Sequence, residues 1–173
     1  IIYRPYRERS PETVKALLQR SLACTGYDEL SLASLSSGDY SSIQPLIIAR
    51  MAGSRDSRVS VSLPSLRVGT LTPEMVRAIA TTRKTGFTLA PEAGSERLRR
   101  VINKPVSDLD LRDAAETIFA NGWSLLKLYF MIALPTETYQ DLDGIIRLVH
   151  DLLAVGKRAT KRHVQLNVSI STF

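Results

Sequence analysis

The chain has 173 residues, 44% of them hydrophobic, which suits one domain with a buried core but is shorter than a complete eight-fold α/β barrel. Its 23 Lys and Arg exceed its 17 Asp and Glu, so the formal net charge is +6, much of it near the two ends. The single cysteine excludes intrachain disulfides, and the lack of apolar runs approaching about 18 residues argues against membrane spans. We expect a cytoplasmic protein with no membrane contact.

The first predicted helix runs from Pro11 to about Cys24. Ser10 precedes it as an N-cap, Pro11 and Glu12 suit its first turn, and Gly26 ends it. Cys24 falls on the last turn of this helix, whose residue pattern predicts an amphipathic helix. We therefore expect the Cys24 side chain to be buried as a small apolar group.

Strands and helices then alternate along the chain. Apolar and alternating runs predict five strands, at residues 29–36, 58–63, 86–90, 125–132 and 163–171. Helical spacing and capping residues predict helices at about 41–51, from Thr72 onward, and at 95–102, 107–121 and 138–155. The inward side of the helix at 107–121 is predicted to comprise Leu111, Ala114, Ala115, Ile118 and Phe119. This alternation predicts an α/β fold with a parallel sheet and right-handed crossovers.

Small polar side chains recur within three of the predicted strands. They are Ser31, Ala33 and Ser36, then Ser60 and Ser62, and finally Asn167, Ser169 and Ser171. An ordinary doubly wound sheet buries Val, Ile and Leu on both faces instead. We therefore expect a curved sheet whose concave face lines a wet cavity for a polar ligand. The alternative is a packed barrel in which these groups bond to their neighbours.

The carboxyl ends of parallel strands are where α/β folds bind their ligands. After the first strand, Gly38 permits close backbone approach and Asp39 offers a carboxylate suited to an ammonium group, although the same turn also suits a helix cap. After the second strand, Arg67 suits either a ligand carboxylate or a neighbouring acid.

The ends of the third and fourth strands carry two further candidates. Glu92 comes directly before Ala93-Gly94-Ser95, where its carboxylate can accept hydrogen bonds from a ribose diol or complement a helix dipole. The run from Met131 to Pro135 forms a flat apolar shelf suited to an adenine ring, although such a run is more often core.

Together these junctions resemble the radical S-adenosylmethionine (SAM) superfamily over nearly the whole chain. Residues 35–40 are similar to its Gly-Gly-Glu-type motif for the methionyl amino group, with Ser37-Gly38-Asp39 replacing the usual triplet. Residues 91–104 are similar to its E-S-G-S…L…M-N-R signature, with Ala93 and Lys104 as departures. Residues 130–137 resemble its G-x-I-x-G-L-P-x-E-T segment near adenine, with Ala133 in place of Gly.

This resemblance implies a partial (β/α)6 TIM-like barrel over residues 1–173, with about five βα units present. It also implies an enzyme that binds SAM and a 4Fe–4S cluster and reductively cleaves SAM to a 5′-deoxyadenosyl radical. The residues implied to bind SAM are Ser36, Ser37, Gly38, Asp39, Ser62, Arg67, Glu92, Ser95, Ile132, Ala133 and Leu134. No residue of this chain is implied to be catalytic or to bind a metal.

The nearest resemblance is to radical SAM proteins with an N-terminal cobalamin-binding-like domain. In those proteins the run R-P-x-R-E-R-S-P-E, here residues 4–12, directly follows the CxxxCxxC cluster loop. We therefore expect a chain truncated at both ends, without the cluster cysteines and inactive alone. The longer protein is expected to be an oxidoreductase or transferase with flanking domains, with cobalamin as a candidate second cofactor and a small molecule or RNA as its unknown substrate.

Two other classes stay open at the level of sequence. A phosphate-handling α/β barrel enzyme is disfavoured because neither common Gly-rich phosphate loop occurs. A non-enzymatic RNA-binding module would use the basic ends, but only Tyr3 and Tyr6 lie beside basic residues, so an aromatic stacking platform is lacking.

Overall fold

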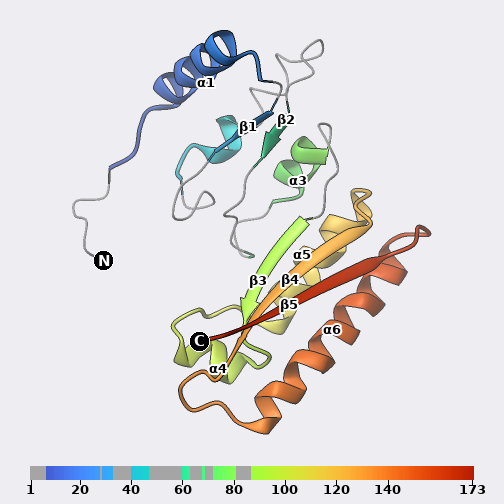
Figure 1. The fold of residues 1–173 in the computed structure, drawn as a ribbon. Helices are drawn as coiled ribbons and strands as arrows, with labels where there is room; N and C mark the ends of the chain where they lie inside the picture. Colours follow the sequence, from blue (N-terminus) through green and yellow to red (C-terminus); the bar gives the residue numbers. More distant parts are fainter. Residues whose placement is uncertain are drawn as a thin grey trace.

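The computed structural model describes residues 7–27, 29–32, 40–46, 60–62, 68, 72–80 and 87–173. Figure 1 shows its elements, which in chain order are α1 (Pro11–Thr25), β1 (Glu29–Ser31), β2 (Ser60–Ser62), α3 (Pro73–Ala80), β3 (Phe87–Glu92), α4 (Glu96–Val101), α5 (Asp108–Ala120), β4 (Leu125–Ile132), α6 (Tyr139–Ala159) and β5 (Gln165–Thr172). Residues 43–46 are also helical, where the sequence predicts a helix. The order of elements agrees with the predicted alternation.

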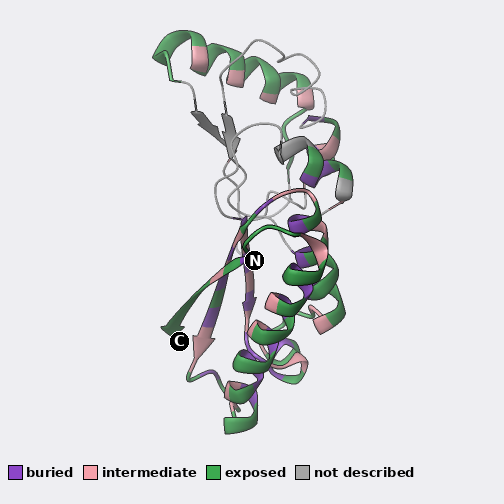
Figure 2. Cartoon of the chain, turned by 90° about the vertical axis from the view of Figure 1, so that its right-hand side faces the viewer, coloured by how far each residue is buried: buried purple, intermediate pink, exposed green. Residues whose placement is uncertain are grey.

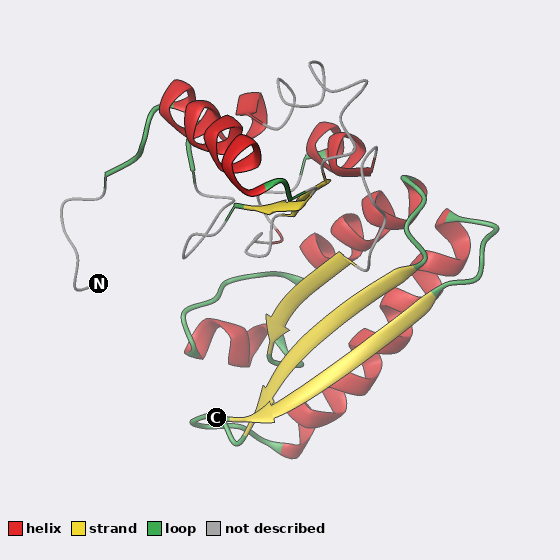
Figure 3. Cartoon of the chain, turned by 45° about the horizontal axis from the view of Figure 1, so that its top comes forward, coloured by secondary structure: helices red, strands yellow, loops and turns green. Residues whose placement is uncertain are grey.

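The described strand pairs are all parallel. β1 pairs with β2, while β3, β4 and β5 form a three-stranded sheet with β4 in the centre. The N–H of Phe173 extends the ladder between β4 and β5 by donating to the carbonyl of Ile132 at 3.0 Å. Helices α5 and α6 lie together on one side of this sheet (Figure 3). The predicted α/β fold with a parallel sheet is confirmed.

Local capping residues fix several helix ends where the sequence predicts them. The Ser10 side chain accepts a hydrogen bond from Thr13 N at 3.2 Å, and Gly26, with φ 70°, ends α1 in the left-handed conformation. Ser107 and Asp110 form a reciprocal capping box at the start of α5. Its hydrogen bonds from Ser107 lower the pKa of Asp110. Local sequence alone therefore places these boundaries.

The prediction that Cys24 is buried is wrong. Cys24 is exposed, and α1 has no fully buried side chain. The half-buried positions include Val14, Leu18 and Leu22, which form one stripe at helical spacing. Cys24 lies two residues beyond Leu22, or about 200° around the helix, so it faces away from that stripe.

The main core lies between the three-stranded sheet and helices α5 and α6. All five residues predicted to face inward from α5 are buried. They meet a row of buried strand residues, namely Phe87, Leu89, Leu126, Leu128 and Phe130. Figure 2 shows buried positions on the facing sides of the strands and helices, with exposed positions on the outer helix surfaces. Each fully buried Leu or Phe contributes about 1.5 to 3 kcal/mol, so this packing is the main force that holds α5 and α6 on the sheet.

Several elements differ from their predicted bounds, and β5, for example, covers Gln165–Thr172 rather than 163–171. β3 runs through Pro91 to Glu92 rather than ending at Ala90, because an irregularity in register between Leu89 and Glu92 lets the strand continue. α6 continues past Gly156 to Ala159. Gly156 does not end this helix, since a Cβ there would lie 2.8 Å from side-chain atoms of Phe119 and Val164, so the glycine permits close packing instead.

The face of the sheet away from α5 and α6 is largely polar. In β4 its positions are Leu125, Lys127, Tyr129 and Met131, which pair with Gln165, Asn167, Ser169 and Ser171 of β5. All four of these β5 residues are exposed in the described structure. The predicted polar face is therefore present in β5, while the side chains of β1 and β2 lie outside the described part of the chain.

Candidate functional site

The carboxyl ends of β3 and β4 lie side by side, and each ends in a residue with strained backbone. Glu92 has φ 69° and pairs in register with Phe130, while Ala133, directly after β4, has φ 63°. A residue other than glycine in this region costs about 1 to 3 kcal/mol and is concentrated at functional sites. The strain at two neighbouring strand ends marks this edge as the candidate site.

Specific polar contacts hold both strained residues. Lys104 donates from Nζ to Glu92 Oε1 at 2.7 Å, and both side chains are about one quarter exposed, at 27% and 25%. The backbone N–H of Ala133 donates to Glu137 Oε2 at 2.7 Å. In the described structure, Lys104 engages one oxygen of Glu92, so the second carboxylate oxygen is left for a ligand donor.

Behind this edge, the loop after β3 packs directly on the first turns of α6. A Cβ on Gly94 would lie 2.3 Å from both Asp141 O and Ile145 N, and a Cβ on Gly144 would lie 2.7 Å from Gly94 O. Real Cβ atoms essentially never approach this closely. Glycine at both positions is therefore required by the contact between the two backbones.

Asp141 is the buried acid of this contact, with 3% of its surface exposed. Its carboxylate accepts hydrogen bonds from Ser95 Oγ, from an Arg97 guanidinium nitrogen, and from the N–H and hydroxyl of Thr138. Burial raises its pKa, but the hydrogen bonds from Arg97, Ser95 and Thr138 outweigh that effect and hold the pKa well below the usual value. Arg97 also donates to Thr136 O at 2.8 Å, so one acid ties the two strand-to-helix loops together.

A second buried charged residue, Arg99, holds the loop after β3 by hydrogen bonds to its backbone. Arg99 has no exposed surface, and it donates to Val106 O at 2.7 Å, to Ala93 O at 3.0 Å and to a carboxylate oxygen of Asp108. These three acceptors use the fork of the guanidinium group, which a lysine cannot reproduce. The backbone of Ala93, next to Glu92, is thereby fixed.

The structure places the predicted site residues unequally. Glu92 is partly buried at the end of β3, and Ala133 is exposed directly after β4. Ser95 is occupied, because its hydroxyl donates to Asp141 and accepts from Leu98 N at 3.1 Å. Leu134 is buried with Ala93 and Leu98, and Ile132 packs against the main core. Of the three residues predicted to contact adenine, Ile132 and Leu134 thus pack in the apolar clusters and Ala133 is exposed, while the contact itself stays a prediction.

The other predicted site residues are not placed. Ser36, Ser37, Gly38, Asp39 and Arg67 lie outside the described residues. Ser62 is the last residue of β2, where it pairs with Ser31, but its side chain is outside the description. Their assignment to SAM binding stays a prediction.

The sequence reasoning missed the two residues that organise the edge, Arg97 and Asp141. Asp141 had a local signal, since Thr138-x-x-Asp141 has the spacing of a capping box, and in the structure the N–H and the hydroxyl of Thr138 both donate to the Asp141 carboxylate. Arg97 had none, because it meets Asp141 across 44 residues of sequence. Such a contact follows from tertiary structure rather than from spacing.

The donor set for an iron–sulfur cluster is not present in this chain. A 4Fe–4S cluster is held by several cysteine thiolates, whereas the sequence contains one cysteine, which is exposed on α1. Within the described ranges no group of three or more His, Cys, Asp or Glu side chains is arranged to hold a metal ion. In the same part of the chain no helix is both long and apolar enough to cross a membrane.

The fold and this edge define an α/β domain with its candidate site at the carboxyl ends of a parallel sheet. A family model described as "Radical SAM superfamily" matches residues 1–149, and the chain belongs to that family. The uncharacterized protein MJ0966 of Methanocaldococcus jannaschii is 32% identical over 169 residues, which cover 98% of this chain and 36% of that protein.

Solved structures show the same architecture. Coproporphyrinogen III oxidase (HemN) from Escherichia coli, a radical SAM enzyme, has a TM-score of 0.64 and 9% identity, over 96% of this chain and 38% of that one. Streptococcus suis SuiB, solved bound to the precursor peptide SuiA, has a TM-score of 0.60 and 11% identity, over 100% of this chain and 44% of that one. At such identities the likeness shows the fold. The chain spans 36% of the curated relative, well under half its length.

Proposed function

We propose that this chain forms the SAM-binding part of the barrel in a radical SAM enzyme. When bound, SAM supplies the 5′-deoxyadenosyl radical on reductive cleavage. The observation that carries the proposal is the edge formed by Glu92 and Ala133, where a partly exposed carboxylate and an exposed strained turn lie at the ends of neighbouring strands. Family membership favours this function over a phosphate-handling barrel or an RNA-binding module.

Each part of the edge has its own role in the proposal. Glu92 accepts hydrogen bonds from the ribose hydroxyls of SAM, and Lys104 orients the Glu92 carboxylate. The backbone around Ala133 lies against the adenine, held in place by the side chain of Glu137. Ser95, Arg97 and Asp141 act through the backbone, since they fix the two loops rather than contact the ligand. The further SAM contacts proposed are Ser36, Ser37, Gly38, Asp39, Ser62 and Arg67.

Isothermal titration of SAM into the full-length, anaerobically reconstituted protein tests this role. Glu92→Gln keeps the shape of the side chain but removes the charge, and a hydrogen bond to a charged group contributes about 1.5 to 3 kcal/mol, so the Kd should rise about 10- to 100-fold. Asp151→Asn is the matched control, because this exposed carboxylate pairs with Arg112, away from the edge. Unchanged affinity in Glu92→Gln would remove Glu92 from the proposal.

We also propose that the 173-residue chain alone neither assembles the cluster nor cleaves SAM, because it supplies one thiol. Anaerobic incubation with iron and sulfide, followed by absorbance and EPR spectroscopy, should give no 4Fe–4S signal. A 4Fe–4S EPR signal from the chain alone would overturn this statement. Four statements stay predictions for the longer protein: a cytoplasmic location, flanking domains, a small-molecule or RNA substrate, and use of cobalamin.

A further inference from the structure

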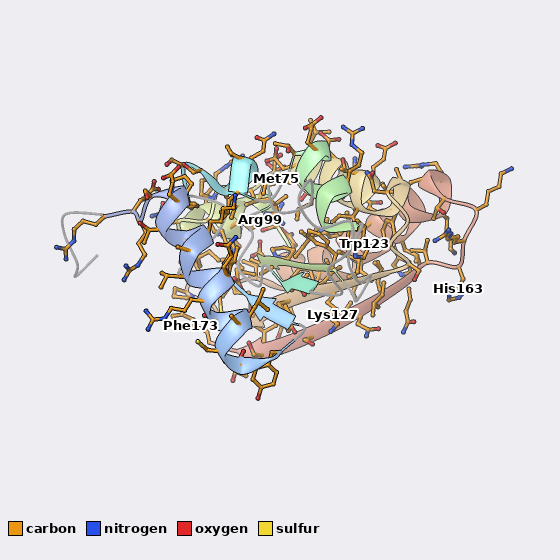
Figure 4. All side chains as sticks on the ribbon, turned by 90° about the horizontal axis from the view of Figure 1, so that it is seen from above. Met75, Arg99, Trp123, Lys127, His163 and Phe173 are labelled. Atoms are coloured by element: carbon orange, nitrogen blue, oxygen red, sulfur yellow. The ribbon has the colours of Figure 1, made fainter. Side chains whose placement is uncertain are left out.

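Lys127 occupies the middle strand of the sheet, on the face that α5 and α6 leave uncovered. It pairs in register with Thr88 of β3 and Asn167 of β5, so all three side chains lie on one side of the sheet. In the view from above, Lys127 lies on the opposite side of the strands from Trp123, which is buried in the core (Figure 4). The lysine is partly buried.

This lysine differs from the other cations of the described structure that are at least partly buried. Lys104 and Arg99 each have a carboxylate partner, at Glu92 and Asp108 respectively. Lys127 has no hydrogen bond or ion pair with any described residue. A charged group taken partly out of water normally has a partner, because desolvation is otherwise uncompensated.

The surrounding residues favour an anion over a cation. Around Lys127 the uncovered face comprises Thr88, Ala90, Leu125, Tyr129, Met131, Gln165, Asn167, Ser169 and Ser171. None of these neighbouring side chains is acidic, and several carry hydroxyl or amide groups that can donate hydrogen bonds. The acid that follows at the end of β3, Glu92, is paired with Lys104. Asn167 already accepts from Gln165 at 3.0 Å through its oxygen, which leaves its NH₂ as a donor toward a ligand.

We propose that Lys127 and its neighbours Thr88 and Asn167 form a subsite that binds an oxyanion, a carboxylate or phosphate, of the substrate. The assignment of this anion to a substrate rests on the proposed radical SAM function, whereas the anion site itself does not. Lys127 lies three residues before Phe130, the register partner of Glu92, so Glu92 is about 10 Å further along the sheet at 3.3 Å per residue. Ala133 lies six residues, or about 20 Å, beyond Lys127. From this separation we assign Lys127 to binding and orienting the substrate.

The first test uses competitive acylation of lysines in the full-length protein, quantified by mass spectrometry of each peptide. Inorganic phosphate and acetate are the two probes, added separately at matched ionic strength with chloride as the reference. At about ten times its dissociation constant, a bound anion should slow acylation of Lys127 about tenfold. Lys161, exposed in the turn before β5, is the internal control and should react at an unchanged rate.

Each outcome of this test bears on the proposal. Protection of Lys127 by phosphate alone assigns a phosphate-bearing substrate, protection by acetate alone a carboxylate, and protection by both an oxyanion site that accepts either. Equal acylation of Lys127 in all three salts overturns the proposal, and so does equal protection of Lys161.

Two variants separate this inference from the proposed function. Lys127→Met keeps the length of the side chain without its charge, and Lys127→Arg keeps the charge. Anion binding, followed by NMR of the Asn167 side-chain amide, should be lost in the Met variant and retained in the Arg variant, while SAM affinity stays within about twofold in both. If SAM binding persists but no anion effect is seen in the wild type, the inference fails and the proposed function stands. If the anion effect is seen but SAM does not bind, the proposed function fails and the anion site stands.

Discussion

Gly94 and Gly144 meet backbone to backbone, and neither position has room for a methyl group: a Cβ on Gly144 would lie 2.7 Å from the carbonyl oxygen of Gly94. This contact joins the loop after β3 to the start of α6. Because Glu92 lies two residues before Gly94, the position of the candidate ligand carboxylate depends on a contact made by two residues without side chains.

The first prediction concerns Gly144→Ala. Alanine is favoured over glycine inside a helix by about 1 kcal/mol, so this change in α6 would ordinarily stabilise the protein. Here we expect the opposite, a loss of about 2 to 3 kcal/mol in the free energy of unfolding, because the methyl group would push α6 away from the loop. The melting temperature, measured by circular dichroism, reports the sign of the change.

Gly26→Ala serves as the comparison for Gly144→Ala. Gly26 has a positive φ, but nothing lies within 4 Å of the position that a Cβ would occupy. Its cost should be about 1 to 2 kcal/mol from backbone strain alone, without any effect on SAM affinity. A stabilised Gly144→Ala protein would show that the loop and α6 are not in contact in solution.

The second prediction concerns Asp141 and pH. The pKa of Asp141 is lower in the folded protein than in the unfolded chain, so the folded state is favoured where the carboxyl is ionised in both states. This contribution is fully present above the ordinary aspartate value of about 3.9, and it is lost progressively as the pH falls below that value toward the folded-state pKa. Stability should therefore fall on acidification more steeply in the wild type than in Asp141→Asn.

At pH 7, Asp141→Asn should also lose about 1.5 to 3 kcal/mol, since the buried carboxylate that accepts from Ser95, Arg97 and Thr138 is replaced by a neutral amide. The measurement is the free energy of unfolding between pH 2 and pH 7. Asp110→Asn is the control, because its pKa is lowered too but by a local and exposed capping box, so its effect should be much smaller. Parallel pH profiles for the wild type and Asp141→Asn would contradict the prediction.

Features that depend on interactions between residues close together in the sequence could be predicted, and features that depend on distant residues could not. Ser10 and Ser107 mark helix starts because their capping hydrogen bonds span three residues. The observed bounds of β4 are those predicted, 125–132, because polar or turn residues lie on both sides of its apolar run. The parallel order of the strands follows from the alternation of elements, which restricts topology strongly.

The organisation of the site was less predictable. Motif resemblance indicated Glu92, but its pairing with Lys104 and its left-handed backbone depend on how the loop closes. The pair Arg97 and Asp141 required the fold, and the error at Cys24 came from assigning a helix face without knowing which stripe is covered. Helix caps and hydrophobic periodicity can thus be predicted from the sequence, whereas contacts between the loops at the sheet edge cannot.

The third prediction concerns Ala133→Gly. Ala133 has φ 63°, which costs an L-residue about 1 to 2 kcal/mol, whereas glycine adopts this conformation freely. Glycine also gives the unfolded chain more freedom, which offsets about 0.5 to 1 kcal/mol of the gain. The net expectation is a stabilisation of up to about 1 kcal/mol, measured as a rise in melting temperature of about 2 to 4 °C.

Ala154→Gly is the matched control, since Ala154 is exposed within α6, and there the same change should destabilise by about 1 kcal/mol. Destabilisation of similar size at both positions would show that the backbone at Ala133 is not strained, and it would remove one of the two observations that mark this edge as the site.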